Sequence, residues 1–284
     1  MAATKAPAAT IEFQHIRFLP AADGGGGTGT AIMQFADPAP AVAFAVAMSP
    51  ETLTAPTQAD LALLLIPAEA PNKTDWERRA REWLEASPGP APVRILLDED
   101  DRDWILFRPG QAVISAHARD LGSLLAAVVD FAYHEFQLRE LETQIATDWP
   151  MVEKHLPLIH DVNAETKKAL GDLGPATKQA MLRRMRYARL EPHLVSVPDT
   201  FRNSSRQAAR RLRARTNIEA RLEAADAQIE VYEDVYDMAN QRVGEHTHFI
   251  KEYRMELLIL IVLSAELIVI LVDFYMNHFR PVVE

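Results

Sequence analysis

The chain has no cysteine, which excludes disulfide bonds and thiolate metal sites. It also lacks the G-x-S-x-G sequence of a nucleophile elbow, and its glycine-rich run, Ala21 to Gly29, precedes a strand instead of the Lys-Ser/Thr pair of a phosphate-binding loop. The first residues, MAATKAPAATIEF, have one lysine and no apolar core, so we expect neither a signal peptide nor a transit peptide. Nothing in these patterns specifies a catalytic site, and we expect no cofactor.

The chain has fewer basic residues than acidic ones, 30 against 40, and its net charge is −10. This charge argues against a protein that coats nucleic acid generally. One segment departs from that average: eleven positive residues and two acidic ones lie between Lys178 and Arg215. The candidate partner-binding or RNA-binding residues in it are Arg183, Arg184, Arg186, Tyr187, Arg189, Arg206, Arg210 and Arg213. Arginines with an interleaved aromatic residue can contact RNA phosphates and stack on a base. Salt bridges, within the chain or to a neighbouring subunit, and another acidic partner are the alternatives.

The first 116 residues have the periodicity of strands. Alternating or short apolar runs predict strands at Ile11 to Leu19, Thr30 to Phe35, Ala41 to Met48, Leu61 to Ile66, Val93 to Leu97, Trp104 to Phe107 and Gln111 to Ser115. Thr74 or Asp75 is the expected cap of a helix that includes Leu84. A strand-rich part followed by helices indicates an α+β globular head.

Helical periodicity follows, first from Asp120 to Ile145. Glycines and prolines are then expected to cut the chain into shorter helices, one of them Ala176 to Leu190; the breaking residues are Pro150, Pro157, Gly171, Gly174, Pro175, Pro192 and Pro198.

The C-terminal 70 residues carry a seam of apolar positions, Ile218 to Leu257, spaced alternately by four and three. This period predicts a long coiled-coil stalk and hence a homo-oligomer. Met255 to Phe274 then contains only three ionisable residues, Glu256, Glu266 and Asp273. A helix of this length and composition is typical of a membrane span, with a buried helix of a soluble core as the alternative.

These patterns divide the chain into five parts: a strand-rich α+β part (1–116), a helical part with the basic segment (117–200), a coiled-coil stalk (201–254), a transmembrane helix (255–274) and a short tail (275–284). Arg242, Lys251 and Arg254 precede the span and Arg280 alone follows it. The positive-inside rule therefore predicts a single-pass membrane protein with its large N-terminal part in the cytoplasm.

Two groups of polar residues have chemistry to consider. Glu266 is either a proton or ion site within the membrane or, the interpretation we favour, a hydrogen-bonding residue shared between helices of an oligomer. Asp130 and His134 lie one helical turn apart with Glu135 beside them, which makes them weak catalytic candidates and half of a metal site. Without a second pair of ligands nearby, a hydrogen-bonded helix face is favoured and no metal is predicted.

Several motifs occur in a familiar order: Trp104 to Ile114, Val129 to Phe131 with Glu135, Leu194 to Phe201, and Asn240 to Arg242 before a span that contains Glu266. This order resembles the required-for-meiotic-nuclear-division family. The resemblance implies an N-terminal α+β domain and a C-terminal membrane helix, without established catalytic residues, and its better-known eukaryotic members are mitochondrial membrane proteins linked to organelle translation. Arg202 and Asn203 follow Phe201 where the family tends to have Trp-Glu, which suggests a divergent bacterial-type member.

The function we expect is that of a membrane-anchored, homo-oligomeric scaffold or tether, not an enzyme. Its partners are the bilayer, other copies of itself, and an acidic partner at a basic cytoplasmic surface, with RNA or a translation-related assembly among the candidates. The alternative is a membrane-anchored, metal-dependent enzyme that processes RNA or nucleotides. A role in ion coupling through Glu266 is the third possibility.

Overall fold

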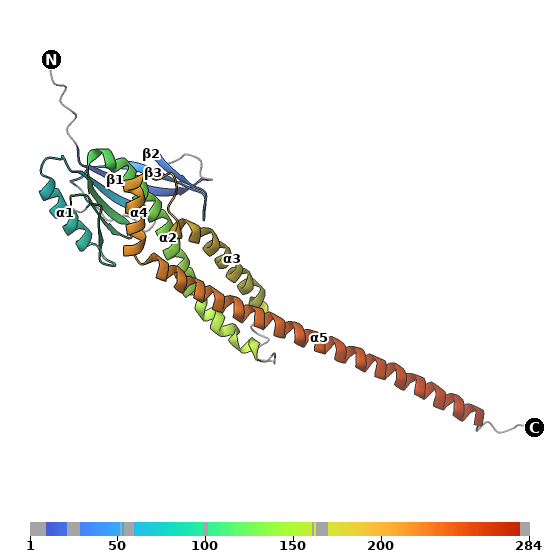
Figure 1. Cartoon of the computed structure of the whole chain (residues 1–284). Coiled ribbons are helices and arrows are strands. Elements are labelled where there is room, and N and C mark those ends of the chain that lie inside the picture. The colour runs from blue at the N-terminus through green and yellow to red at the C-terminus, as the bar shows by residue number, and fades with distance from the viewer. Residues whose placement is uncertain are drawn as a thin grey trace, which may run out of the picture. The chain divides into compact units, whose positions relative to one another are not determined.

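The computed structural model describes residues 10–21, 29–51, 53, 60–98, 102–160, 162 and 170–278. It confirms an α+β chain, in which a seven-stranded sheet is followed by helices and by a long C-terminal helix with an apolar end (Figure 1). The chain forms two compact units. The first unit comprises Met1–Thr147 and Met181–Glu230, and the second comprises Asp148–Ala180 and Val231–Glu284.

The sheet lies in the first unit and has the strand order β2-β3-β1-β4-β7-β6-β5. The strands are β1 (Glu12–Pro20), β2 (Thr30–Phe35), β3 (Ala41–Met48), β4 (Asp60–Pro67), β5 (Val93–Leu96), β6 (Trp104–Arg108) and β7 (Gln111–Ala116). All seven predicted strands are confirmed, with ends that differ by one residue at most. β4 pairs with β7 in parallel, and the other neighbours are antiparallel. β4 is buried along nearly its whole length, as its uninterrupted apolar sequence predicts for a central strand.

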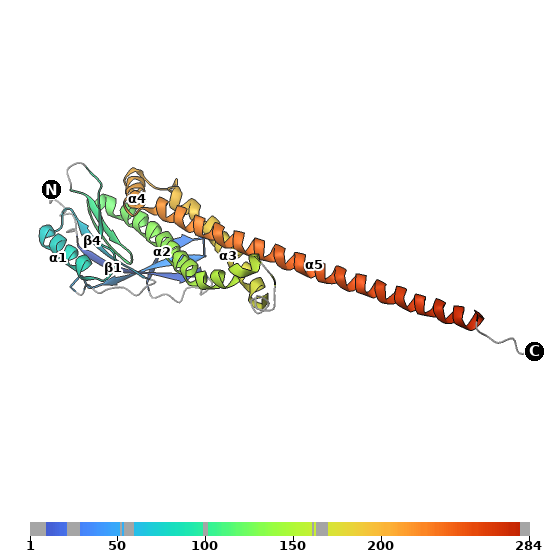
Figure 2. The ribbon, with the colours of Figure 1, turned by 90° about the horizontal axis from the view of Figure 1, so that it is seen from below.

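Two helices cover opposite faces of this sheet. Trp83 and Leu84 of α1 (Lys73–Ala86) pack in one core cluster with Trp104 and Leu106 of β6. Successive residues of a strand point to opposite faces, so Phe107 faces the other side. There its ring meets Phe131 of α2 (Ala118–His155) at a centroid distance of 5.1 Å. Figure 2 shows both helices with β1 and β4 between them.

The start of α1 differs from the prediction. The residue before the helix is Asn72, in the left-handed conformation at φ 59°, and it makes no side-chain cap hydrogen bond. Thr74 and Asp75 lie within the helix, so the predicted cap was wrong. Asparagine tolerates this conformation better than most residues, which explains why the helix can begin directly after it.

The predicted breaks in the helical region are partly wrong. α2 continues through Pro150 to His155, where a short 3-10 turn, η2 (Leu156–Ile159), contains Pro157. α3 (Leu170–Val195) includes Gly171, Gly174, Pro175 and Pro192. A proline removes one helical hydrogen bond. Buried apolar residues stand on both sides of it, such as Leu190 and Leu194 around Pro192, and their packing outweighs that loss.

The predicted stalk is not one helix from residue 201. α4 (Asn203–Arg215) ends before Thr216 and Asn217, and α5 (Ile218–His278) begins after Asn217, which has φ 54°. The left-handed residue changes the chain direction between the two helices. α5 therefore starts at the first residue of the apolar seam.

The seam of α5 is covered by the same chain over its first half. Ile218, Leu222, Ala225 and Ile229 are at most 3% exposed in the first unit. In the second unit Tyr232 packs on Trp149, with ring centroids 5.3 Å apart, and Tyr236 packs on His155. A heptad period predicts a helix with one apolar stripe, but it does not specify what covers that stripe. A coiled coil between copies stays a prediction.

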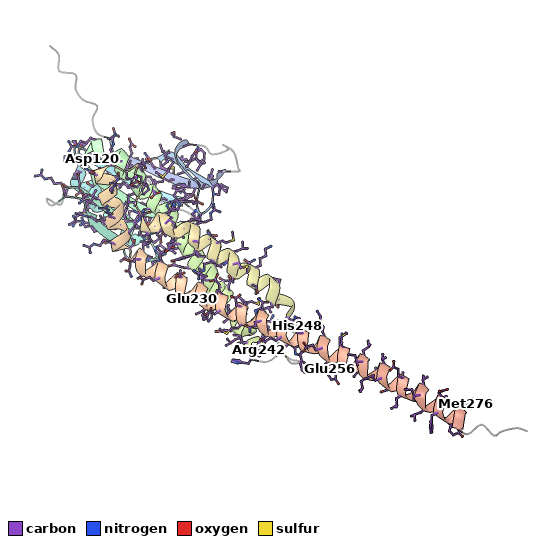
Figure 3. All side chains as sticks on the ribbon, turned by 45° about the vertical axis from the view of Figure 1, so that its right-hand side comes forward. Asp120, Glu230, Arg242, His248, Glu256 and Met276 are labelled. Carbon is purple, nitrogen blue, oxygen red and sulfur yellow. The ribbon has the colours of Figure 1, made fainter. Side chains whose placement is uncertain are left out.

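The apolar end of α5 is bare. The side chains described between Met255 and Met276 are exposed on every side of the helix, and Figure 3 shows them from Glu256 to Met276. The most apolar window of this helix has a mean hydropathy of 2.8 and is 0% buried. The chain thus has a helix long and apolar enough to cross a membrane, and the predicted span 255–274 lies inside it. Residues 279–284 of the predicted tail and most of the Ala21 to Gly29 loop lie outside the described residues.

Candidate functional site

The arginines of α3 are largely engaged within the first unit. Arg184 Nη1 lies 2.5 Å from Asp226 Oδ1, and Arg189 Nη2 lies 2.6 Å from Asp37 Oδ1. Arg186 donates to Glu140 Oε2 at 2.6 Å and to the side-chain oxygens of Gln137 and Gln144. Arg183 is half-buried. These contacts match the intramolecular salt bridges that were one of the alternatives for this segment.

Tyr187, the aromatic residue among these arginines, is buried. Its side chain is 6% exposed, and the guanidinium of Arg184 lies 6.0 Å from its ring centroid. Burial and the nearby carboxylates of Glu191 and Asp226 raise the pKa of Tyr187 to about 12. The ring is thus packed inside the first unit and offers little surface for stacking on a base.

Three arginines of α4, Arg206, Arg210 and Arg213, line a pocket of about 530 Å³. One wall is the end of α3 with the segment after it, and the others are α4 and the first turns of α5. The lining residues are Leu194, Val195, Ser196, Val197, Asp199, Arg206, Arg210, Arg213, Ala214, Ile218, Glu219 and Leu222. All of them belong to the first unit.

Arg213 holds two walls of this pocket together. It is 8% exposed, and its Nε donates to the Leu194 carbonyl at 2.8 Å while Nη2 donates to the carbonyls of His193 and Ser196. These are carbonyls at and just after the C-terminus of α3, which a helix leaves without partners. Burial lowers the pKa of Arg213, although Asp130, 3.8 Å from Nη2, raises it. Nη1 has no hydrogen-bond acceptor among the described residues.

Arg206 and Arg210 lie one turn apart on α4, and both reach solvent. Arg206 is 38% exposed and makes only long contacts, with Nη2 3.3 Å from the Asp199 carbonyl oxygen and 3.9 Å from its carboxylate. Arg210 is exposed and has no ion pair with any described residue. Glu219, in the first turn of α5, adds one negative charge to the lining. The pocket thus combines accessible guanidinium groups with an apolar wall.

The three weak catalytic candidates on α2 are all buried, with Asp130 7%, His134 2% and Glu135 1% exposed. Asp130 Oδ1 lies 3.5 Å from His134 Nδ1, and His134 stacks on His193 with ring centroids 4.7 Å apart. Burial raises the pKa of Asp130 to about 6 and lowers the pKa of His134 to about 4. Among the residues that the structure describes, no three His, Asp or Glu side chains are grouped to hold a metal ion.

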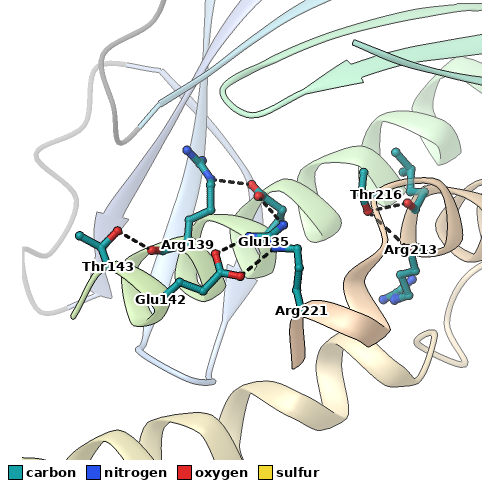
Figure 4. A network of polar contacts seen from close by, with 8 residues as sticks. Glu135, Arg139, Glu142, Thr143, Arg213, Thr216 and Arg221 are labelled. Carbon is teal, nitrogen blue, oxygen red and sulfur yellow. Dashed lines mark hydrogen bonds and ion pairs between the residues drawn. The ribbon is translucent and has the colours of Figure 1, made fainter. Parts of the chain in front are cut away.

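Glu135 belongs to a separate network, drawn in Figure 4. Its carboxylate accepts from Arg139 Nε at 2.9 Å and from Arg221 Nη1 at 3.1 Å. Arg221 also forms a two-pronged contact with Glu142, at 2.9 and 2.8 Å. Burial opposes the charge of Arg221, but the carboxylates of Glu142 and Glu135 outweigh it and raise the pKa of Arg221. The network joins α2 to the first turn of α5 and explains Glu135 as a structural residue.

Glu266 lies on the bare apolar part of α5. The side chains next to it on the helix surface are Ile261, Val262, Ala265, Val269 and Ile270. Ser264, beside it in sequence, donates its hydroxyl to the Leu260 carbonyl at 2.7 Å. Glu266 is thus a single carboxyl group in an apolar surface, as the sequence indicates.

The sequence patterns did not reveal the pocket, because its walls come from three helices. The missed lining residues include Leu194 to Val197 and Glu219. One signal was present: Thr216 and Asn217 separate two helical patterns, and asparagine favours the left-handed conformation that it adopts here. A break at this point places α4 and α5 on different sides of a common space.

Comparison with known proteins adds no assignment, because no protein-family model and no curated protein matches this chain in sequence. The resemblance to the required-for-meiotic-nuclear-division family therefore stays a prediction.

Proposed function

We propose that this protein is a membrane-anchored binding module, in which the end of α5 crosses the bilayer and the first unit contacts an acidic partner. The observation that carries the proposal is the exposure of the α5 side chains from Met255 to Met276. The largest apolar patch on a typical soluble monomer is about 300–600 Å². This exposed segment of about twenty mostly apolar residues is far more apolar than the surface of a soluble protein, and its length suits a hydrocarbon core about 30 Å thick.

The charges next to the span support a cytoplasmic location for the first unit. Arg242, Lys251 and Arg254 lie on the N-terminal side within about 15 residues of the apolar stretch, where such charges influence topology. Arg280 alone lies on the other side.

The arrangement of polar groups favours binding over catalysis. Asp130, His134 and Glu135 are buried, whereas Arg206 and Arg210 are accessible. Accessible arginines without strong internal partners are the groups through which an acidic partner such as RNA or a ribonucleoprotein would be bound.

In this proposal the membrane helix mediates self-association. The seam of α5 is already covered by the same chain as far as Ala239, which is 0% exposed. Glu266 has no polar neighbour in the surrounding apolar surface, and a protonated carboxyl group shared between two copies would satisfy it.

Alkaline carbonate extraction of membranes from cells that produce the full chain tests the anchor. We expect the wild type to stay with the membrane pellet, and the double substitution L263R/I268R to abolish this retention because each arginine costs about 2.5–3.5 kcal/mol near the bilayer centre. Val231→Arg is the matched control, since Val231 is exposed on α5 outside the span and its change should leave retention unaltered. Wild-type protein in the carbonate supernatant would overturn the proposal.

The acidic partner has its own test. The full chain in phosphatidylcholine nanodiscs is titrated with a single-stranded RNA at several salt concentrations, and Arg210→Gln should reduce the slope of log Kd against log salt by about 0.7 if that residue contacts a phosphate. Absence of binding at low salt would exclude RNA as the acidic partner.

A further inference from the structure

The pocket between the end of α3, α4 and α5 has the composition of a small-molecule site. Its volume of about 530 Å³ falls within the roughly 300–1,000 Å³ of ligand pockets. Its most deeply buried apolar residues are Leu194, Ile218 and Leu222, at 1%, 2% and 3% exposed. Arg206 and Arg210 are its accessible polar residues. Such a pocket offers an apolar interior and cationic groups nearer to solvent.

The three arginines are on one face of α4, because residues 206, 210 and 213 are spaced by four and three. Like charges at this spacing repel each other. Among the described residues these arginines lack the close ion pairs of the α3 arginines: Arg206 has only the exposed Asp199 at 3.9 Å, and Arg210 has no ion pair. Arg213 has Asp130 at 3.8 Å, a distance longer than a hydrogen bond. Exposed ion pairs contribute little, so Arg206 can exchange Asp199 for another anion at small cost.

Arg213 provides an independent observation. This side chain is 8% exposed and lines the pocket, and its Nη1 has no hydrogen-bond acceptor among the described residues. Buried polar groups in proteins are almost always hydrogen-bonded. Nη1 is itself shielded from solvent, so an oxyanion in the pocket would reach it after a small movement of the Arg213 side chain and would supply the acceptor. Guanidinium groups pair with phosphate and carboxylate through parallel hydrogen bonds.

We propose that this pocket binds a small amphiphilic anion, a molecule with one phosphate or carboxylate group on an apolar body. The anionic group is held by Arg206 and Arg210 beside Arg213, and the apolar body packs against Leu194, Ile218 and Leu222. Glu219 opposes the anion and sets an upper limit to the charge that the pocket accepts. This inference uses the two arginines that the proposed function gives to an acidic partner, so the small anion and that partner would compete for them. It does not depend on the membrane anchor, because all of the lining residues belong to the first unit.

Isothermal titration of the full chain in phosphatidylcholine nanodiscs tests the inference, with hexyl phosphate, inorganic phosphate and hexanol as separate probes. We expect hexyl phosphate to bind more tightly than either part alone, because the pocket contacts both the anion and the chain. Equal affinity for inorganic phosphate and hexyl phosphate, or no heat from hexyl phosphate, would overturn the proposal.

Variants give changes of opposite sign. Arg210→Gln should weaken hexyl phosphate binding by about 10- to 100-fold, since it removes a charge-assisted hydrogen bond. Glu219→Gln should tighten binding several-fold, because it removes the negative charge in the lining. Arg81→Gln is the control of equal charge change, at an exposed residue of α1 that has no ion pair with a described residue, and it should leave the affinity unaltered. A general charge effect would make Arg81→Gln and Arg210→Gln alike and would refute a specific site.

One further titration distinguishes a lipid ligand from a free one. Nanodiscs that contain phosphatidic acid should abolish hexyl phosphate binding if the natural ligand is a lipid of the bilayer, and should leave it intact if the ligand is a free molecule. Either result requires a working pocket and supports the proposal.

Discussion

Replacing Arg221 with methionine should destabilise the first unit by about 2–3 kcal/mol. Glu135 is 1% exposed, and Arg221 supplies one of its two cationic partners, at 3.1 Å. Removing one partner of a buried ion pair costs about 3–5 kcal/mol, because the other charge stays buried. We place the loss below that range for two reasons: Glu135 keeps Arg139 at 2.9 Å, and the Arg221 side chain is 25% exposed and partly screened by solvent.

The measurement is urea unfolding of the full chain in detergent, followed by fluorescence of the tryptophans, three of which, Trp76, Trp83 and Trp104, lie in the first unit. Arg221→Lys should recover only part of the loss, since a lysine cannot form the two-pronged contact with Glu142. Arg78→Met is the control. Arg78 also pairs with two carboxylates, Asp75 and Glu82, but all three side chains are more than half exposed, so the unfolding midpoint should not move.

The reasoning is refuted if Arg221→Met and Arg78→Met unfold at the same urea concentration as the wild type. That result would mean that Glu135 finds water or Arg139 alone sufficient. The double substitution of Arg221 and Glu135 by methionine gives a second check, because it should cost less than Arg221→Met alone once no buried charge is left unpaired.

Three further outcomes are expected in the same unfolding assay. Burial lowers the pKa of His134 from 6.5 to about 4, so the stability that the neutral ring provides is fully present above pH 6.5 and is lost as the pH falls to about 4. In His134→Phe the free energy of unfolding should therefore fall by about 3 kcal/mol less over this pH range than in the wild type. Burial raises the pKa of Asp130 from 3.8 to about 6, a shift that already includes the attraction to Arg213, so the stability kept by the neutral carboxyl group below pH 3.8 is lost as the pH rises to about 6. Asp130→Asn should therefore stabilise the protein at pH 7 by up to about 3 kcal/mol more than at pH 3.5, and an equal effect at both pH values would contradict this. Arg108 is 3% exposed and donates to three carbonyls, that of Leu84 in the last turn of α1 and those of Ser87 and Pro88 just after it. Arg108→Met should therefore cost about 3 kcal/mol or more, with no change in m-value if the fold is kept.

Much of the secondary structure could be predicted because apolar side chains repeat with the period of the element that buries them. The seven strands follow from short apolar runs such as Ala41 to Met48, and α5 begins at the first residue of its seam, Ile218. The predicted breaks at Pro150 and Pro192 were wrong for the reason that local preferences are small. One lost hydrogen bond is outweighed when the residues on either side are packed.

The sequence predicted the arginines of the candidate site but not which of them remain free of ion pairs. Both arginine groups have the same composition, yet Arg186 and Arg189 of α3 are paired with carboxylates and amides from distant segments, whereas Arg210 of α4 is not. Sequence spacing shows which residues share a helix face, but ion pairs such as that of Arg189 with Asp37 join residues 152 positions apart. Those pairings decide which charges remain available to a ligand.

By itself, the sequence determined two features: an α+β succession of elements and a long helix with an apolar stripe and an apolar end. Both depend on local periodicity, which is a property of neighbouring residues. Only the tertiary structure decided which residues cover the stripe and which arginines form ion pairs within the chain. The residues that bury Ile229 and pair with Arg221 are brought there by folding of the same chain, and no local pattern could distinguish them from the surface of a second copy.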